Sequence, residues 1–90
     1  MIKAAPTVEV IEVPEEGLVA LLGKTVTFFC LNYIYTGQLT GVNETCILLE
    51  NPFIVYETGP FTDSHWKDAQ KLPSPLYIQT GAIESFGVIK

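Results

Sequence analysis

The stretch GKTVTFFCLNYIYTGQLTGVN, residues Gly23–Asn43, decides the fold of this 90-residue chain. Its first part alternates with a period of two, so that Val26, Phe28 and Cys30 lie on one face of an extended segment. A short connection then leads into Ile34–Val42, which is again rich in β-branched and aromatic residues. Two adjacent antiparallel strands are therefore predicted.

The predicted strands carry signals of strong bending. Gly37 and Gly41 interrupt the second strand at positions typical of a bend or bulge. A third strand begins at Cys46–Leu49 and resumes after Asn51-Pro52 as Phe53–Glu57. Proline has no backbone N–H to donate, so a kink or an edge position is expected there.

The regions before and after these strands are predicted from local signals. Residues 1–13 are expected to form an arm or an extra edge strand, and the domain proper is expected to span residues 14–90. Pro14-Glu15-Glu16 favours the start of a short helix that Gly23 would end. Residues 58–75 are expected to form a long loop with a helical turn around Ser64–Gln70.

Two strands, Tyr77–Thr80 and Ile83–Ile89, are predicted after the loop as a hairpin-like pair. The expected fold class is therefore mainly β. A short N-terminal helix precedes a five-stranded, strongly bent antiparallel sheet, and such sheets usually close into a small barrel of the SH3 or OB type.

Composition narrows the possible functions. Of the residues, 48% are hydrophobic and only 17% are charged. This apolar share is larger than a small monomer needs to bury, which indicates self-association. The sequence has no bilayer-length apolar run and no secretory signal, so we expect a cytoplasmic protein without a membrane partner. Cys30 and Cys46 are expected to be core residues without a disulfide, and no cofactor or metal site is predicted.

The charge of the chain disfavours simple binding to nucleic acid. The formal net charge is −5, and the five basic residues are all lysines. The overall field therefore repels phosphate, and any phosphate contact would need lysines, backbone amides or polar side chains. A symmetric oligomer would multiply a small local patch.

The residues above resemble the two motifs of the Sm and Sm-like proteins. Val26, Phe28 and Cys30, followed by the segment 37–43, are similar to the first motif, V-x-V-x-L and then G-x-L-x-G-[F/V]-[D/N]. Residues 78–86 are similar to the second motif, I-R-G-x-x-I-x-x-I, with Gln79-Thr80 where the family has Arg-Gly. The resemblance implies a closed ring of about five to seven subunits that binds single-stranded nucleic acid.

The resemblance places two loops at the opening of such a ring. They carry Asn43, Thr45, Gln79, Thr80 and Gly81, whose polar groups can bind a base edge or a phosphate. The alternative is ordinary turn chemistry, in which the same side chains stabilise the loops. Neither the Met-Asn pair nor the Arg-Gly pair by which typical members grip a base is matched here.

The long loop offers a second candidate nucleic-acid site. Trp66, Lys67 and Lys71 combine an aromatic ring with basic groups, as base stacking and phosphate neutralisation require, and Phe61 and His65 lie close by in the sequence. The alternative is a loop that packs its own aromatic side chains against the sheet. No nucleophile motif or metal cluster is visible, so we expect no enzymatic activity.

The final strands are the expected assembly element. In an Sm-like ring the fourth strand of one subunit pairs with the fifth strand of its neighbour. The interface residues would be Tyr77, Ile78, Ile83, Phe86 and Val88. Two functions stay open: a non-catalytic ring that binds single-stranded RNA or DNA, and a ring-shaped structural or adaptor module that binds protein partners.

Overall fold

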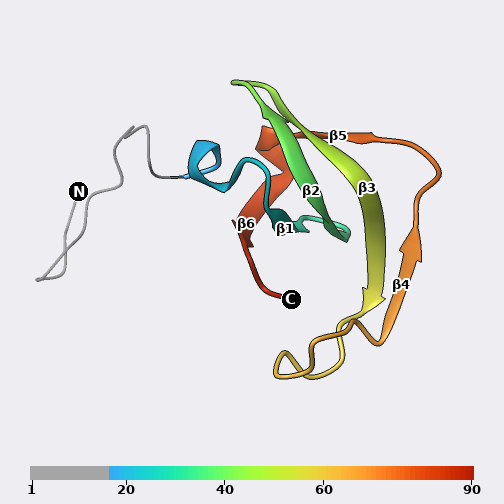
Figure 1. The fold of residues 1–90 in the computed structure, drawn as a ribbon. Coiled ribbons are helices and arrows are strands. Elements are labelled where there is room, and N and C mark those ends of the chain that lie inside the picture. The colour runs from blue at the N-terminus through green and yellow to red at the C-terminus, as the bar shows by residue number, and fades with distance from the viewer. Residues whose placement is uncertain (1–16) are drawn as a thin grey trace, which may run out of the picture.

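The computed structural model describes residues 17–90, which form one six-stranded antiparallel sheet (Figure 1). The strand order is β4-β3-β2-β1-β6, and β5 pairs separately with β3. The elements are η1 (Val19–Leu21), β1 (Thr25–Cys30), β2 (Ile34–Val42), β3 (Cys46–Glu57), β4 (Asp68–Lys71), β5 (Leu76–Gln79), η2 (Thr80–Ala82) and β6 (Ile83–Gly87). The prediction of a mainly β fold with bent antiparallel strands is confirmed.

The long strand β3 bends where Asn51-Pro52 lies opposite Gly37 of β2. Pairing passes from Gln38 opposite Glu50 to Thr36 opposite Phe53, so two residues of β3 face one residue of β2. Asn51 has a φ of 49°, and the Pro52 side chain is fully buried. This bulge confirms the predicted kink, and it divides β3 into a first half that pairs with β5 and a second half that pairs with β4.

The main core lies on one face of the bent sheet. Its buried apolar side chains come from four strands and are Val26, Phe28, Leu39, Ile47, Leu49 and Ile78. Leu18 and Leu21 pack against them from the segment before β1. The alternation predicted for β1 therefore holds for Val26 and Phe28, while Cys30 is half-buried at the margin of this core.

A second buried layer lies on the opposite face. In register, Thr27 of β1 lies beside Thr36 of β2, which lies beside Phe53 of β3. Both threonines are buried, and their hydroxyl groups lie 3.4 Å apart. Trp66 and Lys90 line a hollow of about 550 Å³ together with Thr36 and Phe53, so the loop after β3 and the segment after β6 approach this face.

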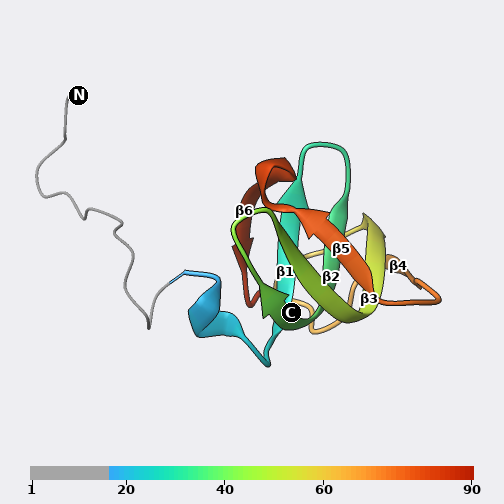
Figure 2. The same ribbon diagram turned by 90° about the horizontal axis from the view of Figure 1, so that it is seen from above.

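The sheet does not close into the predicted barrel. Within residues 17–90, β4 and β6 end the hydrogen-bonded path, and no strand joins one to the other. Six strands are present instead of five because β4 forms within the segment predicted to be a long loop. The expected final hairpin is also wrong, since β5 pairs with β3 and β6 pairs with β1 (Figure 2).

The predicted N-terminal helix is wrong within the described residues. Only the single 3₁₀ turn η1 forms, between Gly17 with a φ of 72° and Gly23 with a φ of 86°. Only five residues lie between these two left-handed glycines, little more than one turn of an α-helix. The arm at residues 1–13 and the helix start at Pro14-Glu15-Glu16 lie outside the described residues, and no helix in the described part is long and apolar enough to cross a membrane.

The predicted long loop contains a strand. Asp68–Lys71 forms β4 beside the second half of β3, where a helical turn was expected to extend to Gln70. The irregular segment after β3 is therefore residues 58–67, and a second connection at residues 72–75 leads into β5. Polar residues at an exposed edge lack the apolar alternation by which strands are recognised.

Candidate functional site

The two loops predicted to share a site do lie together. Glu44 and Thr45, in the turn between β2 and β3, contact Thr80 at the end of β5. The Thr80 amide donates to the Thr45 carbonyl at 2.9 Å, and the Thr80 hydroxyl donates to the Glu44 carbonyl at 2.9 Å. Cys46 lies directly opposite Gln79 in the ladder between β3 and β5. We call residues 43–46 and 79–81 the loop pair.

Asn43 organises the first loop through its own side chain. Its Oδ1 accepts hydrogen bonds from the Thr45 amide at 2.8 Å, the Cys46 amide at 2.9 Å and the Thr45 hydroxyl at 3.0 Å. The Asn43 amide in turn donates to the Cys46 carbonyl. This is an Asx turn, so the carbonyl oxygen of the side chain serves the loop itself.

The other members of the loop pair differ in how far they are engaged. The Thr80 hydroxyl is used within the pair, whereas the exposed Gln79 side chain has no hydrogen bond to another described residue. Gly81 is exposed in η2, and a Cβ placed on it would meet nothing within 4 Å. The side-chain donors of the loop pair without a hydrogen bond to a described residue are thus the NH₂ groups of Asn43 and Gln79.

The aromatic residues of the loop after β3 pack on each other and on a lysine. Phe61 and Trp66 meet edge to face with ring centroids 6.4 Å apart. Lys90 Nζ lies 4.7 Å from the Trp66 ring centroid and 5.7 Å from that of Phe61. The alternative in which the loop packs its own aromatic side chains fits this geometry, because Lys90 covers the rings that a base would stack on.

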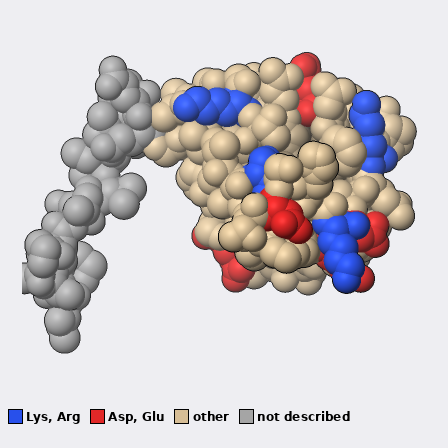
Figure 3. Space-filling view, turned by 60° about the horizontal axis from the view of Figure 1, so that its bottom comes forward, with Lys and Arg blue, Asp and Glu red and all other residues tan. Residues whose placement is uncertain are grey.

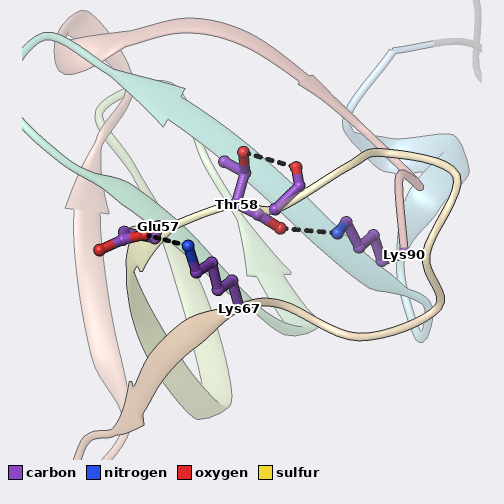
Figure 4. Close-up of polar contacts among 5 residues, drawn as sticks. Glu57, Thr58, Lys67 and Lys90 are labelled. Atoms are coloured by element: carbon purple, nitrogen blue, oxygen red, sulfur yellow. Dashed lines mark hydrogen bonds and ion pairs between the residues drawn. The ribbon is translucent and has the colours of Figure 1, made fainter.

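The basic groups of this second site are dispersed. Lys67 Nζ lies 3.2 Å from Glu57 Oε2 (Figure 4), and Lys71 lies on β4 opposite Phe53. Seen from the side of the loop, lysine and acidic side chains alternate on the surface (Figure 3). The loop pair lies at the start of β3 and the aromatic loop at its end, so the two predicted sites do not join (Figure 1).

The predicted interface residues lie mainly on or beside β5 and β6, which together with β4 are the described strands that pair with a single neighbour. Tyr77 of β5 is 68% exposed and Phe86 of β6 is 39% exposed, while Val88 follows β6 and is also exposed. Ile83 is half-buried against the core. The Ile78 side chain is 6% exposed within the core, so this residue can offer only its backbone to a neighbour.

A hollow beside β5 has no counterpart among the predicted sites. It has a volume of about 250 Å³ and lies between the turn after β1 and strand β5. Its apolar lining includes Leu31, Tyr33, Tyr35, Leu76 and Tyr77, and we call it the tyrosine hollow. The sequence signal was the tyrosines on or beside strands, but only the pairing of β3 with β5 brings Tyr77 close to Tyr33 and Tyr35.

Two titratable groups of the tyrosine hollow have perturbed pKa values. Burial raises the pKa of the Cys30 thiol, and the Glu84 carboxylate adds to the rise. Burial also raises the pKa of the Tyr35 hydroxyl, with smaller contributions from Cys30, Tyr33 and Tyr56. Both shifts favour the neutral form of the group, as suits a surface for apolar contacts.

A metal site is not found in the described part of the chain, where no cluster of three or more His, Cys, Asp or Glu side chains occurs.

No protein-family model matches the sequence, and no curated protein matches it. The resemblance to the Sm and Sm-like proteins is therefore a prediction that rests on the quoted motifs.

Proposed function

We propose that this chain is a non-catalytic assembly module whose copies join edge to edge, with β5 of one copy against β6 of the next. The observation that carries the proposal is the pair of open edges with exposed aromatic side chains. Among the described strands β5 pairs only with β3, and β6 pairs only with β1. Tyr77 marks one open edge and Phe86 the other.

The tyrosine hollow extends the first edge. Tyr77 and Gln79 of β5 line it, so a strand added to β5 would carry side chains directly over the hollow. The neighbouring copy is the occupant we propose, with Phe86 and Val88 as the apolar groups that cover it. Because the two edges differ, the contact is head to tail. Copies can therefore keep adding until the last one meets the first and closes a ring.

The charge of the chain sets a condition on this interface. Each copy carries a formal net charge of −5, so neighbouring copies repel one another at long range. Association must therefore come from backbone pairing and from burial of apolar surface. The resulting ring would act as a structural or adaptor module, and the Sm resemblance implies a ring of about five to seven copies.

An added negative charge at the β5 edge tests the proposal. Tyr77→Glu is expected to leave the fold intact, since Tyr77 is exposed, and to convert the assembly into monomers in sedimentation velocity. Gln70→Glu is the matched control, because Gln70 is exposed on β4 opposite Ile54 and adds the same charge away from β5 and β6. Equal assembly of the two variants would reject the proposed edge.

Single-stranded nucleic acid is the second candidate ligand, favoured by one observation. The hydrogen bonds from Thr80 to Glu44 and Thr45 hold the predicted loop pair together, as a shared site requires. In a ring this pair would be repeated, so that weak contacts from Asn43 and Gln79 add. The engaged Asn43 Oδ1 and the lysine-covered Trp66 make this candidate weaker than protein assembly.

A salt titration separates the two candidates. Fluorescent oligo(U) or oligo(A) is titrated with the assembled protein at low and at physiological salt, with Gln79→Ala as the site variant and Gln70→Ala, an exposed glutamine on β4, as its control. Binding that Gln79→Ala weakens and Gln70→Ala leaves unchanged supports the nucleic-acid function. An intact assembly that binds neither oligonucleotide at low salt excludes the nucleic-acid function.

A further inference from the structure

The side chain of Lys90 ends in a cage made by the loop after β3. Its Nζ donates hydrogen bonds to three backbone carbonyls, those of Thr58 at 2.7 Å, Pro60 at 2.9 Å and His65 at 2.9 Å. A protonated lysine carries three N–H donors, and each has one carbonyl here. The contact to Thr58 is drawn in Figure 4.

Two aromatic rings complete the cage. The Trp66 ring centroid lies 4.7 Å from Lys90 Nζ and the Phe61 centroid 5.7 Å away, both within the range of cation–π attraction. Carbonyl dipoles and ring faces are neutral groups that favour a cation without a carboxylate. A single nitrogen donates all three hydrogen bonds. An ammonium can do this and a guanidinium cannot, since no guanidinium nitrogen carries more than two N–H groups.

The loop contributes almost everything that the cage needs. The three carbonyls and both rings lie within residues 58–66, and the loop is held by its own hydrogen bonds, including Asp63 amide to Pro60 carbonyl at 3.0 Å and Lys67 amide to Thr58 carbonyl at 3.4 Å. The Lys67–Glu57 ion pair links the end of the loop to the end of β3. The cage thus has supports that do not depend on Lys90.

We propose that residues 58–66 form a binding site for a primary alkylammonium group, which Lys90 fills in this structure. The site would take the ammonium of a lysine side chain or of a free alkylamine whenever Lys90 is withdrawn. A ligand tethered on the same chain acts at a high effective concentration, so an external amine binds measurably only when Lys90 is absent or displaced. The inference is independent of the proposed assembly, whose edges lie on β5 and β6.

Chemical rescue tests the site, with the single tryptophan as its reporter. Lys90→Ala is expected to change the emission of Trp66, and n-butylammonium chloride should reverse the change saturably at millimolar concentration. Tetramethylammonium has a cationic charge but no N–H donor, so it should bind at least tenfold more weakly. The wild-type chain, whose cage is filled, should also respond at least tenfold more weakly than Lys90→Ala.

The matched control is Lys24→Ala, which removes an exposed lysine before β1 and should behave as the wild type. Equal responses of Lys90→Ala to n-butylammonium and tetramethylammonium, or no saturable response, would overturn the proposal. If Lys90→Ala does not fold, NMR of the wild-type chain decides. Ring currents should then shift the ε-methylene protons of Lys90 upfield, and shifts typical of an unfolded peptide would overturn the proposal equally.

Discussion

Gly37 of β2 lies against Pro52 of β3 so closely that a Cβ on Gly37 would stand 3.1 Å from the Pro52 Cα and 3.1 Å from the Glu50 carbonyl oxygen. These are backbone atoms, which cannot move aside as the end of a flexible side chain can. Gly37→Ala is therefore expected to lower the free energy of unfolding by about 1–3 kcal/mol, measured by urea denaturation.

The control for this variant is Gly81→Ala. A Cβ on Gly81 meets nothing within 4 Å, and Gly81 has no positive φ, so its effect should stay within about 0.5 kcal/mol. If both variants are equally stable, the close approach of β2 to the kink does not determine the bend of the sheet.

A substitution of Phe28 tests which residues form the main core. It is fully buried on β1, and its ring stacks on that of Phe86 with centroids 6.2 Å apart. Phe28→Ala should lower the free energy of unfolding by about 3–5 kcal/mol, since it leaves a cavity that the surrounding strands fill only in part. Leu31→Ala, at a residue 72% exposed, should change it by less than about 0.5 kcal/mol. A small effect of Phe28→Ala would contradict the assigned core.

The Asx turn at Asn43 predicts a loss of stability that a conservative variant avoids. Asn43→Ala removes the acceptor of three hydrogen bonds and is expected to cost about 1–2 kcal/mol. Asn43→Asp keeps an acceptor oxygen at the same place and should retain most of the stability. Thermal unfolding followed by circular dichroism measures both. Equal losses in the two variants would mean that these bonds do not hold the turn.

Alkaline pH should destabilise the fold through Cys30 and Tyr35. Their pKa values are raised in the folded state from 9.0 and 10.0, so the folded chain keeps protons that the unfolded chain releases. The stabilisation is complete below about pH 9 and is lost as pH rises through the folded pKa values. Urea denaturation between pH 7 and 11 should thus show a falling free energy of unfolding.

Variants at these two residues isolate their share of the pH dependence. Tyr35→Phe and Cys30→Ala each remove one of the titrating groups, so the fall above pH 9 should be shallower in each than in the wild type. A slope that both variants leave unchanged would show that other groups cause the alkaline loss.

The strands that build the core were predictable because each carries a local signal. The bounds of β2 follow from its β-branched residues, and the kink at Asn51-Pro52 follows from the restricted backbone of proline. The interruption at Gly37 is likewise visible in the sequence, although the sequence does not reveal that Pro52 lies opposite it.

Features that depend on long-range pairing were not predictable. β4 is short and polar, and its strand conformation comes from pairing with β3 and not from its own side chains. The pairing of β5 with β3, and not with β6, replaces the predicted hairpin and brings Tyr77 to the hollow. The cage around Lys90 joins residues 25 to 32 positions apart through backbone carbonyls, which leave no trace in the side-chain pattern.

The mass of the native chain in solution tests the central claim, assembly through the β5 and β6 edges, most directly. Light scattering coupled to size-exclusion chromatography at micromolar concentration should give a closed species of about 50–70 kDa, which is five to seven copies of a 9.9 kDa chain. A single species of 9.9 kDa at every concentration would contradict the claim.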